Sequence, residues 1–516
     1  MCTRARLNLE SEMCMSTVGT GSGPAEGTSV RYEQQLSRSL SLRANVLITL
    51  SSVTPASSVF IILPSVIVAV GGASFIALLA AALVGVAMAY CYAELSSAFP
   101  IAGGEYSFAA RVLGKSTGFA LFLMNALSII LIIAVVALGT GEYLSAAWAG
   151  ANSKWAGVVV IVVCAAVAVL NIRLNAWVTG TFLVVEMAAL VVLTLLGFLH
   201  VSRPVSTLLH PQALSGGGGV LAAASWGLVA AQTATALFAY NGYGAAVYFA
   251  EETKGASRGI AKVILFSLGI TVAAELIPTT AVVLGAPSLP KLMGSTAPMQ
   301  YFLTSRGGDT VNTIVSLGVA LAIINAVVAI TLQAGRTVYA SARDRAYPDR
   351  ISSALAHVHP RFHTPVTATL LVGLLAAVIA AIVPLNTLIT ATGATVVILY
   401  AVVALSALVG RRNGTTSLAR YKMPAWPLAP VVVLVALIYV TYQLYRANPA
   451  QVGIALGALA LGYVYYYAYL RPRRADRWTM PDAPFDEHDA RDEEPGGVLM
   501  GPVLELNPPG VPEQPS

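Results

Sequence analysis

Charged side chains are scarce in this chain of 516 residues. Asp, Glu, Lys and Arg make up 10% of the sequence, whereas hydrophobic residues make up 57%. Soluble globular proteins carry about 25% charged residues, so this composition excludes a soluble enzyme, a disordered protein and a nucleic-acid-binding domain. The net charge of +6 does not indicate nucleic acid as a partner, because the basic residues lie in short loops between apolar runs.

Cysteines and catalytic signatures are also lacking. The sequence has four cysteines, too few for a disulfide scaffold and without the spacing of metal ligands: Cys2, Cys14, Cys91 and Cys164. It contains no recognisable nucleophile–base constellation and no phosphate-binding glycine loop. We therefore expect no enzyme activity, no metal, no cofactor and no use of ATP.

Long apolar runs are what the sequence has in abundance. A run of about 20 residues is long enough to cross the ~30 Å hydrocarbon core as a helix, and backbone groups in lipid must be paired within the segment. Strand-like alternation is absent. The sequence therefore predicts an all-α polytopic membrane protein with about twelve transmembrane helices, at residues 44–70, 73–98, 116–147, 155–172, 177–200, 222–250, 260–286, 311–342, 365–383, 387–410, 426–446 and 450–470.

Lys and Arg are distributed unevenly over the loops between these runs. With the N-terminus inside, the inner loops carry fifteen of them and the outer loops five, which is the bias expected of a multi-pass protein of the cytoplasmic membrane. Residues 1–43 are polar and lack the apolar core and cleavage site of a signal peptide, and residues 471–516 are acidic and rich in proline. We expect both to be disordered cytosolic tails.

Two of the predicted spans are interrupted at their centres. Pro55 stands among Ser and Thr residues in the first span, and Gly242 and Gly244 interrupt the sixth. Broken helices at matching positions of two repeats are typical of transporter binding sites. Each break frees N–H groups that attract an anion and C=O groups that attract a cation. The alternative is an ordinary kink, but two matched breaks favour a site.

Three stretches resemble the signatures of the amino acid–polyamine–organocation (APC) permeases. Residues 92–106, continuing to 114, closely resemble the second-helix signature of that family, with the sequence Phe-Pro-Ile-Ala-Gly-Gly-Glu-Tyr at its centre. Residues 238–244 with 251–254 look like its sixth-helix motif, and residues 336–348 look like the end of its eighth helix. The resemblance covers roughly residues 40–470.

This resemblance implies a leucine-transporter-type fold with two inverted five-helix repeats, in which helices one and six are broken. The repeats would span 44–200 and 222–410, followed by two extra helices at 426–470. Amino acids or amines would bind at the breaks. By position, the substrate-binding residues would be Thr54, Ala56, Ser57, Ser58, Phe238, Ala239, Tyr240, Asn241 and Gly242.

Ionisable residues inside membrane spans are costly and therefore candidates for function. Glu186 lies midway along the fifth span, where a buried carboxyl can take up and release a proton, or can simply hydrogen-bond to neighbouring helices. Glu275 in the seventh span is a second candidate, for which the structural role is favoured. Five residues near predicted cytosolic helix ends suit structural or gating ion pairs: Glu94, Glu251, Glu252, Arg336 and Arg343.

Together these features predict a secondary transporter that imports amino acids by alternating access. Its expected partners are the lipid bilayer, a small-molecule substrate, and protons or sodium as the coupling ion. An antiporter or polyamine carrier on the same fold is the nearest alternative. Polyamines need acidic side chains in the pocket, and neither break carries one. A membrane sensor that binds amino acids without transporting them is a third interpretation, which the lack of a folded cytosolic domain disfavours.

Overall fold

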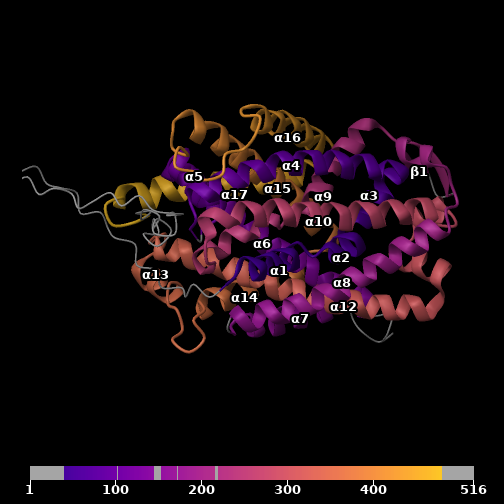
Figure 1. Ribbon diagram of the computed structural model, residues 1–516, viewed down its shortest axis with the longest axis horizontal. Coiled ribbons are helices and arrows are strands. Elements are labelled where there is room, and N and C mark those ends of the chain that lie inside the picture. Colours follow the sequence, from indigo (N-terminus) through magenta and orange to yellow (C-terminus); the bar gives the residue numbers. More distant parts are fainter. Residues whose placement is uncertain (1–39, 102, 145–152, 171, 216–218, 479–516) are drawn as a thin grey trace, which may run out of the picture.

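The computed structural model describes residues 40–101, 103–144, 153–170, 172–215 and 219–478. Most of the two predicted tails, 1–43 and 471–516, lies outside the described residues. Within the described residues the chain forms long helices whose axes run mainly along the longest dimension of the molecule (Figure 1).

The first half of the chain begins with a helix that is broken several times. In order, its helices are α1 Leu42–Val53, α2 Pro55–Ser57, the π-helix η1 Ser58–Ile62, α3 Leu63–Val70, the short η2 Gly71–Ala73, α4 Ser74–Ala98, α5 Glu105–Val112, α6 Lys115–Leu144, α7 Ser153–Ala168 and α8 Ile172–Leu199. The 3₁₀ turn η3 Val205–Leu209 and two short strands, β1 Gln212–Ser215 and β2 Val220–Ala223, lead to the second half.

The second half again contains a broken helix near its start. Its helices are α9 Trp226–Tyr240, the 3₁₀ segment η5 Tyr243–Glu252, α10 Ala256–Gly285, α11 Leu289–Gly294, α12 Pro298–Arg343, α13 Asp349–Leu355, α14 Val366–Ile382, α15 Leu385–Arg412, α16 Leu428–Ala447, α17 Pro449–Tyr465, and the turns η6 Tyr466–Leu470 and η7 Arg471–Arg473. Helix α12 bends sharply at Gly308, which has φ of 79°.

The prediction of an all-α polytopic membrane protein is confirmed in its main feature. Among the described residues, eight helical segments are long and apolar enough to cross a membrane, and two shorter apolar helices accompany them. In its described part every predicted apolar run overlaps a helix, although the run 222–250 begins in β2 and is interrupted after α9. The first of the eight segments, Leu42–Ala98, contains two predicted spans, and the number of crossings stays a prediction.

The small antiparallel sheet is a feature that the sequence did not predict. Strands β1 and β2 pair from Gln212 with Ala223 to Ser215 with Val220. The hairpin lies mostly between the fifth and sixth predicted spans. Its two strands hydrogen-bond to each other, so their backbone groups are paired without a helix. In Figure 1 it lies at one end of the helical bundle, the hairpin end, while α5 and α13 lie at the other, the α13 end.

Small residues allow α8 and α10 to pack closely. A Cβ atom at Gly197 of α8 would lie 2.4 Å from the carbonyl oxygen of Ala281, and one at Gly285 of α10 would lie 2.5 Å from that of Gly197. Close approach through small side chains is the usual way in which membrane helices associate. It holds together the two helices that carry Glu186 and Glu275.

Candidate substrate-binding site

The first break lies between α1 and α2. Helix α1 ends at Val53, and Thr54 adopts a left-handed conformation with φ of 52° and ψ of 68°. For a β-branched residue this conformation is unfavourable by about 1–3 kcal/mol. Pro55 then begins α2, since its fixed φ suits the first helical position and its missing N–H needs no partner there. The predicted interruption is therefore a true change of direction in the backbone.

The second break follows Tyr240 at the end of α9. Asn241 is extended, with ψ of 147°, and Gly242 has φ of 123°, which side chains rarely tolerate. A Cβ atom at Gly242 would lie 2.8 Å from the Cα atom of Val53. Glycine here thus lets the two breaks touch, although about 190 residues separate them.

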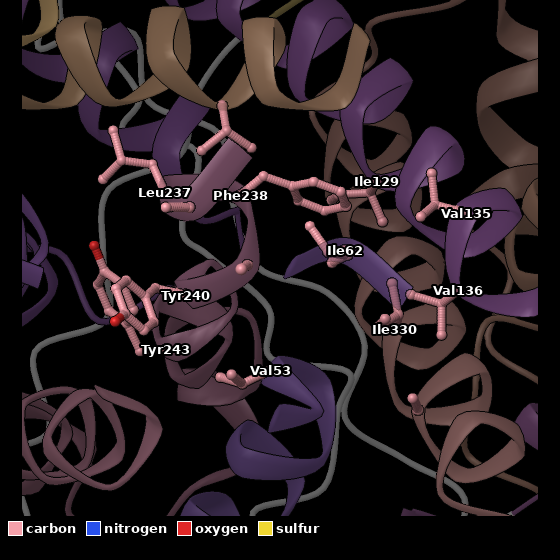
Figure 2. Close-up of a cluster of buried hydrophobic side chains, with 14 of the residues drawn as sticks. Val53, Ile62, Ile129, Val135, Val136, Leu237, Phe238, Tyr240, Tyr243 and Ile330 are labelled. Atoms are coloured by element: carbon pink, nitrogen blue, oxygen red, sulfur yellow. The ribbon is translucent and has the colours of Figure 1, made fainter. Parts of the chain in front are cut away.

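A small internal cavity lies between the two breaks. Its volume is about 30 Å³, which is enough for about two water molecules. Its apolar wall includes Phe238, Ile129 and Ile330, and Figure 2 shows the ring of Phe238 pointing toward Ile129. Its polar wall comes from seven helical elements and the two breaks, and consists of Ser52, Thr54, Ser57, Ser58, Glu105, Asn125, Ser128, Asn241, Tyr248 and Gln333.

Most of the residues predicted to bind substrate line this cavity. Seven of the nine do so: Thr54, Ser57, Ser58, Phe238, Ala239, Asn241 and Gly242. The helix-breaking Gly244 lines it as well, whereas Pro55 does not. The hydroxyl groups of Thr54 and Ser57 are buried and have no hydrogen-bond partner among the described residues. The cavity therefore offers unsatisfied polar groups at the first break.

Ala56 and Tyr240 do not line the cavity, unlike the other predicted contacts. The backbone N–H of Ala56 donates instead to Oε1 of Glu186, at 2.8 Å. Tyr240 lies on the side of the second break opposite to Phe238, because neighbouring positions near the end of a helix face different directions (Figure 2). Both residues are nonetheless fully buried.

Glu105 is a cavity residue to which the sequence analysis gave no role. Its carboxylate accepts hydrogen bonds from the hydroxyl of Tyr92 at 2.8 Å, from Nδ2 of Asn125 at 3.2 Å and from the hydroxyl of Tyr248. The preceding Gly104 has φ of 59°, and a Cβ atom there would lie 2.5 Å from the Tyr248 ring. The signal was a carboxylate directly after two glycines, within the second-helix signature.

Buried ion pairs close the α13 end of the bundle. Nε of Arg336 lies 2.5 Å from Oε1 of Glu252, and both side chains are almost completely buried. Nη1 of Arg343 lies 2.9 Å from Oε1 of Glu251. These four residues were grouped from the sequence, and the structure joins them in pairs.

Glu94, the fifth residue of that group, pairs with Arg411 in the last turn of α15. Its Oε2 lies 3.4 Å from Nη1 of Arg411 and accepts from the backbone N–H of Met423 at 2.8 Å. Its other oxygen accepts from the hydroxyl of Thr416 at 3.1 Å. Glu94 thus connects α4 to the segment that follows α15.

Backbone hydrogen bonds tie the residue before α1 to the end of η5. The N–H of Leu40 donates to the carbonyl of Glu252 at 2.8 Å, and the N–H of Lys254 donates to the carbonyl of Leu40 at 2.9 Å. Nδ2 of Asn45 adds a bond to the hydroxyl of Thr253 at 2.9 Å. The two half-helices on the α13 side of the breaks, α1 and η5, are therefore joined directly.

Comparison with known proteins agrees with this architecture. The sequence matches the family described as amino acid permease over residues 40–465. This chain belongs to the amino acid permease family. The permease is 30% identical over 431 residues to an uncharacterized transporter of Mycobacterium tuberculosis, covering 83% of this chain and 90% of that protein. The APC resemblance is thus confirmed, and the permease is a multi-pass membrane transporter and not an enzyme.

Two relatives from Bacillus subtilis carry substrate names. The permease is 25% identical over 420 residues to the methylthioribose transporter, covering 78% of this chain and 86% of that one. It is 23% identical over 435 residues to a branched-chain amino acid permease, covering 80% of this chain and 89% of that one.

Proposed function

We propose that the permease imports amino acids across the cytoplasmic membrane by alternating access, with both termini in the cytosol. Its repeats would be residues 44–200 and 222–410, with 426–470 as additional helices. The observation that carries this proposal is the cavity at the two breaks, where the hydroxyls of Thr54 and Ser57 lack partners among the described residues. A buried polar group without a partner is unfavourable, so a polar ligand is its natural complement.

The cavity suits a small molecule with a polar end and an apolar end. Free N–H groups at the start of a half-helix favour a carboxylate, and carbonyls at the end of the other favour an ammonium group. Phe238, Ile129 and Ile330 would contact an apolar side chain. The relative named as a branched-chain amino acid permease supports this choice. Because the cavity is small, binding requires it to widen.

The two ends of the bundle support alternating access. At the α13 end lie the ion pairs of Arg336 with Glu252 and of Arg343 with Glu251. Toward the hairpin end, a second hollow of about 500 Å³ is lined by residues that include Phe60, Tyr143 and Pro298. Tyr143 donates to the carbonyl of Phe60 at 2.5 Å, which fixes the turn between this hollow and the cavity. The α13 end also carries a hollow, of about 930 Å³, which is lined by residues that include Arg343 and Asp349. The two ends therefore differ in the buried ion pairs and not in the presence of a hollow.

Glu186 is our candidate for proton coupling. It is fully buried, and its Oε1 holds the N–H of Ala56 at the first break, while its Oε2 has no partner among the described residues. A neutral carboxyl accepts a hydrogen bond more weakly than an ionised one. Protonation at Oε2 would therefore change how firmly the first break is held, and so the balance between the two access states.

An amine carrier is a second candidate, favoured by one observation. Glu105 places a carboxylate in the cavity wall, which supplies the acidic group that neither break carries. Three donors already bind this carboxylate, so little of its charge is left for a substrate. We therefore prefer a zwitterionic substrate to a polyamine.

Uptake by the reconstituted protein tests the proposal. Liposomes with an inward proton gradient and no sodium are given a panel of labelled amino acids and polyamines, with wild type, E186Q and the control D309N, which alters an exposed acid. We expect wild type and D309N to accumulate one class of amino acid, abolished by a protonophore. E186Q should lose accumulation but keep exchange with preloaded substrate.

Other outcomes would change the assignment. Exchange without accumulation in wild type would indicate an antiporter, and uptake of polyamines alone would favour the amine carrier. Accumulation by E186Q at the wild-type level would refute coupling through Glu186. No transport in either format, repeated with sodium, would contradict an amino acid transporter.

A further inference from the structure

Glu275 on α10 is fully buried, and neither of its carboxyl oxygens has a hydrogen-bond partner among the described residues. The hydroxyl of Ser58 lies beside it, but that hydroxyl donates to the carbonyl of Ala239 at 2.9 Å. An ionised carboxylate without partners in an apolar interior is strongly unfavourable. Glu275 therefore requires a proton or another cation in this conformation.

A second acid lies close to Glu275. Glu186 on α8 is near enough for the two carboxyls to repel each other when both are ionised. Close packing at Gly197 and Gly285, about three turns further along, holds α8 against α10. Two acids in this relation can be relieved together by a single positive charge between them.

Tyr240 contributes an independent observation. Tyr240 is 1% exposed, and its phenol hydroxyl has no hydrogen-bond partner among the described residues. The hydroxyl lies within electrostatic range of Glu275. It is the predicted substrate contact that turns away from the cavity. A buried hydroxyl, a carboxylate and the Ser58 oxygen together supply the oxygen ligands that hard cations prefer.

The other charged groups on neighbouring helices are already engaged elsewhere. Helix α4 and segment η5 also pack on α10, and their buried acids, Glu94, Glu251 and Glu252, pair with arginines at the α13 end. Among the described residues, Glu186 is the charged group that acts on Glu275.

We propose that Glu275 and Glu186 form one binding site for a single monovalent cation, a proton or Na⁺, behind the first break and adjoining the substrate cavity at Ser58. The site deepens the proposed function, because it adds a second acid to the coupling at Glu186. Glu186 holds the N–H of Ala56, Ser58 lies beside Glu275, and Tyr240 precedes the second break. The occupancy of one site can therefore act on both breaks.

Cation binding by the purified protein tests this site without any substrate. Thermal unfolding midpoints are measured in detergent at constant ionic strength, with Na⁺ replaced stepwise by choline, and separately over a series of pH values. A cation that binds only the folded state raises the midpoint. We expect wild type and D309N to shift with Na⁺ or with pH, and E275Q to lose that shift.

The two series distinguish the sources of the charge. A shift with Na⁺ at fixed pH identifies sodium, and a shift with pH alone identifies the proton. If E275Q retains the full wild-type shift, Glu275 is not part of the site. If E275Q fails to fold, E275D is measured in its place. Its shorter side chain moves the carboxyl, so a reduced shift is expected, and a shift equal to that of wild type would overturn the proposal.

A double-mutant cycle in transport tests whether the acids act as one site. In the uptake assay, E275Q should lower the accumulation ratio at least ~10-fold, and adding E186Q should lower it no further, as expected for residues that act as a unit. Multiplied losses would show two independent sites. Loss in E275Q with normal accumulation in E186Q would overturn the shared site and refute Glu186 as the coupling residue.

Discussion

Two groups of buried acids differ in their partners. At the α13 end, Glu94, Glu251 and Glu252 each meet an arginine. In the middle of the bundle, Glu105, Glu186 and Glu275 form no ion pair with Lys or Arg among the described residues, although they are just as buried. The residue type and the burial are the same, and only the neighbours differ.

This difference indicates which acids can gain or lose a bound cation. An arginine keeps its charge in proteins, so an acid paired with it has a permanent counter-charge and the pair acts as a fixed fastening. An acid without such a partner can gain or lose a cation as its surroundings change. Glu105 stands between the groups, because three uncharged donors stabilise its charge.

Removing the arginine from the most buried pair should have the largest effect. In R336M, Glu252 is left buried without its partner, which is expected to reduce stability by about 3–5 kcal/mol. Chemical or thermal unfolding of the purified permease measures this. The control R336M/E252Q removes both charges and should recover much of the loss. An unchanged unfolding midpoint in R336M would show that the pair is not a fastening.

Replacing Glu105 tests the intermediate case. E105Q keeps the shape but replaces one acceptor oxygen by an amide donor, which faces the hydroxyls of Tyr92 and Tyr248 or the amide of Asn125. We expect a loss of about 1–3 kcal/mol in unfolding free energy, with Y92F, which removes one donor, losing less. A loss in E105Q as large as that in R336M would place Glu105 with the paired acids.

The partly exposed pair should give the smallest effect. Arg343 is 16% exposed in its side chain, so R343Q is expected to lose about 1–2 kcal/mol, between the values for exposed and buried pairs. The control D349N breaks a pair with Arg477 in which the aspartate is 81% exposed, and should lose under about 1 kcal/mol. A reversed order of R343Q and D349N would contradict the dependence on burial.

Local backbone chemistry explains why the two breaks could be predicted. Pro55 restricts the backbone angles at its own position, and Gly242 widens the range that its position allows. The chain breaks at Thr54 and at Asn241–Gly242 as expected. The helical spans followed in the same way from the length of the apolar runs. Each of these features is determined by residues that are neighbours in sequence.

Contacts between distant segments could not be predicted. Glu186 and Ala56 are 130 residues apart, and Arg411 and Glu94 are 317 residues apart. Whether a buried acid meets an arginine, an amide or another acid depends on how the helices pack, and no local pattern carries that information. Glu105 and Tyr240 show the same limit, since the direction of each side chain decided its role.

The backbone link at Leu40 has a mechanical consequence. It joins α1 and η5 near the α13 end, while Gly242 against Val53 joins them at the breaks. Two segments that are joined at both ends are expected to move as one rigid unit. Any opening of the α13 end would then move α1 and η5 together, so that a force applied just before residue 40 acts on both halves of the molecule at once.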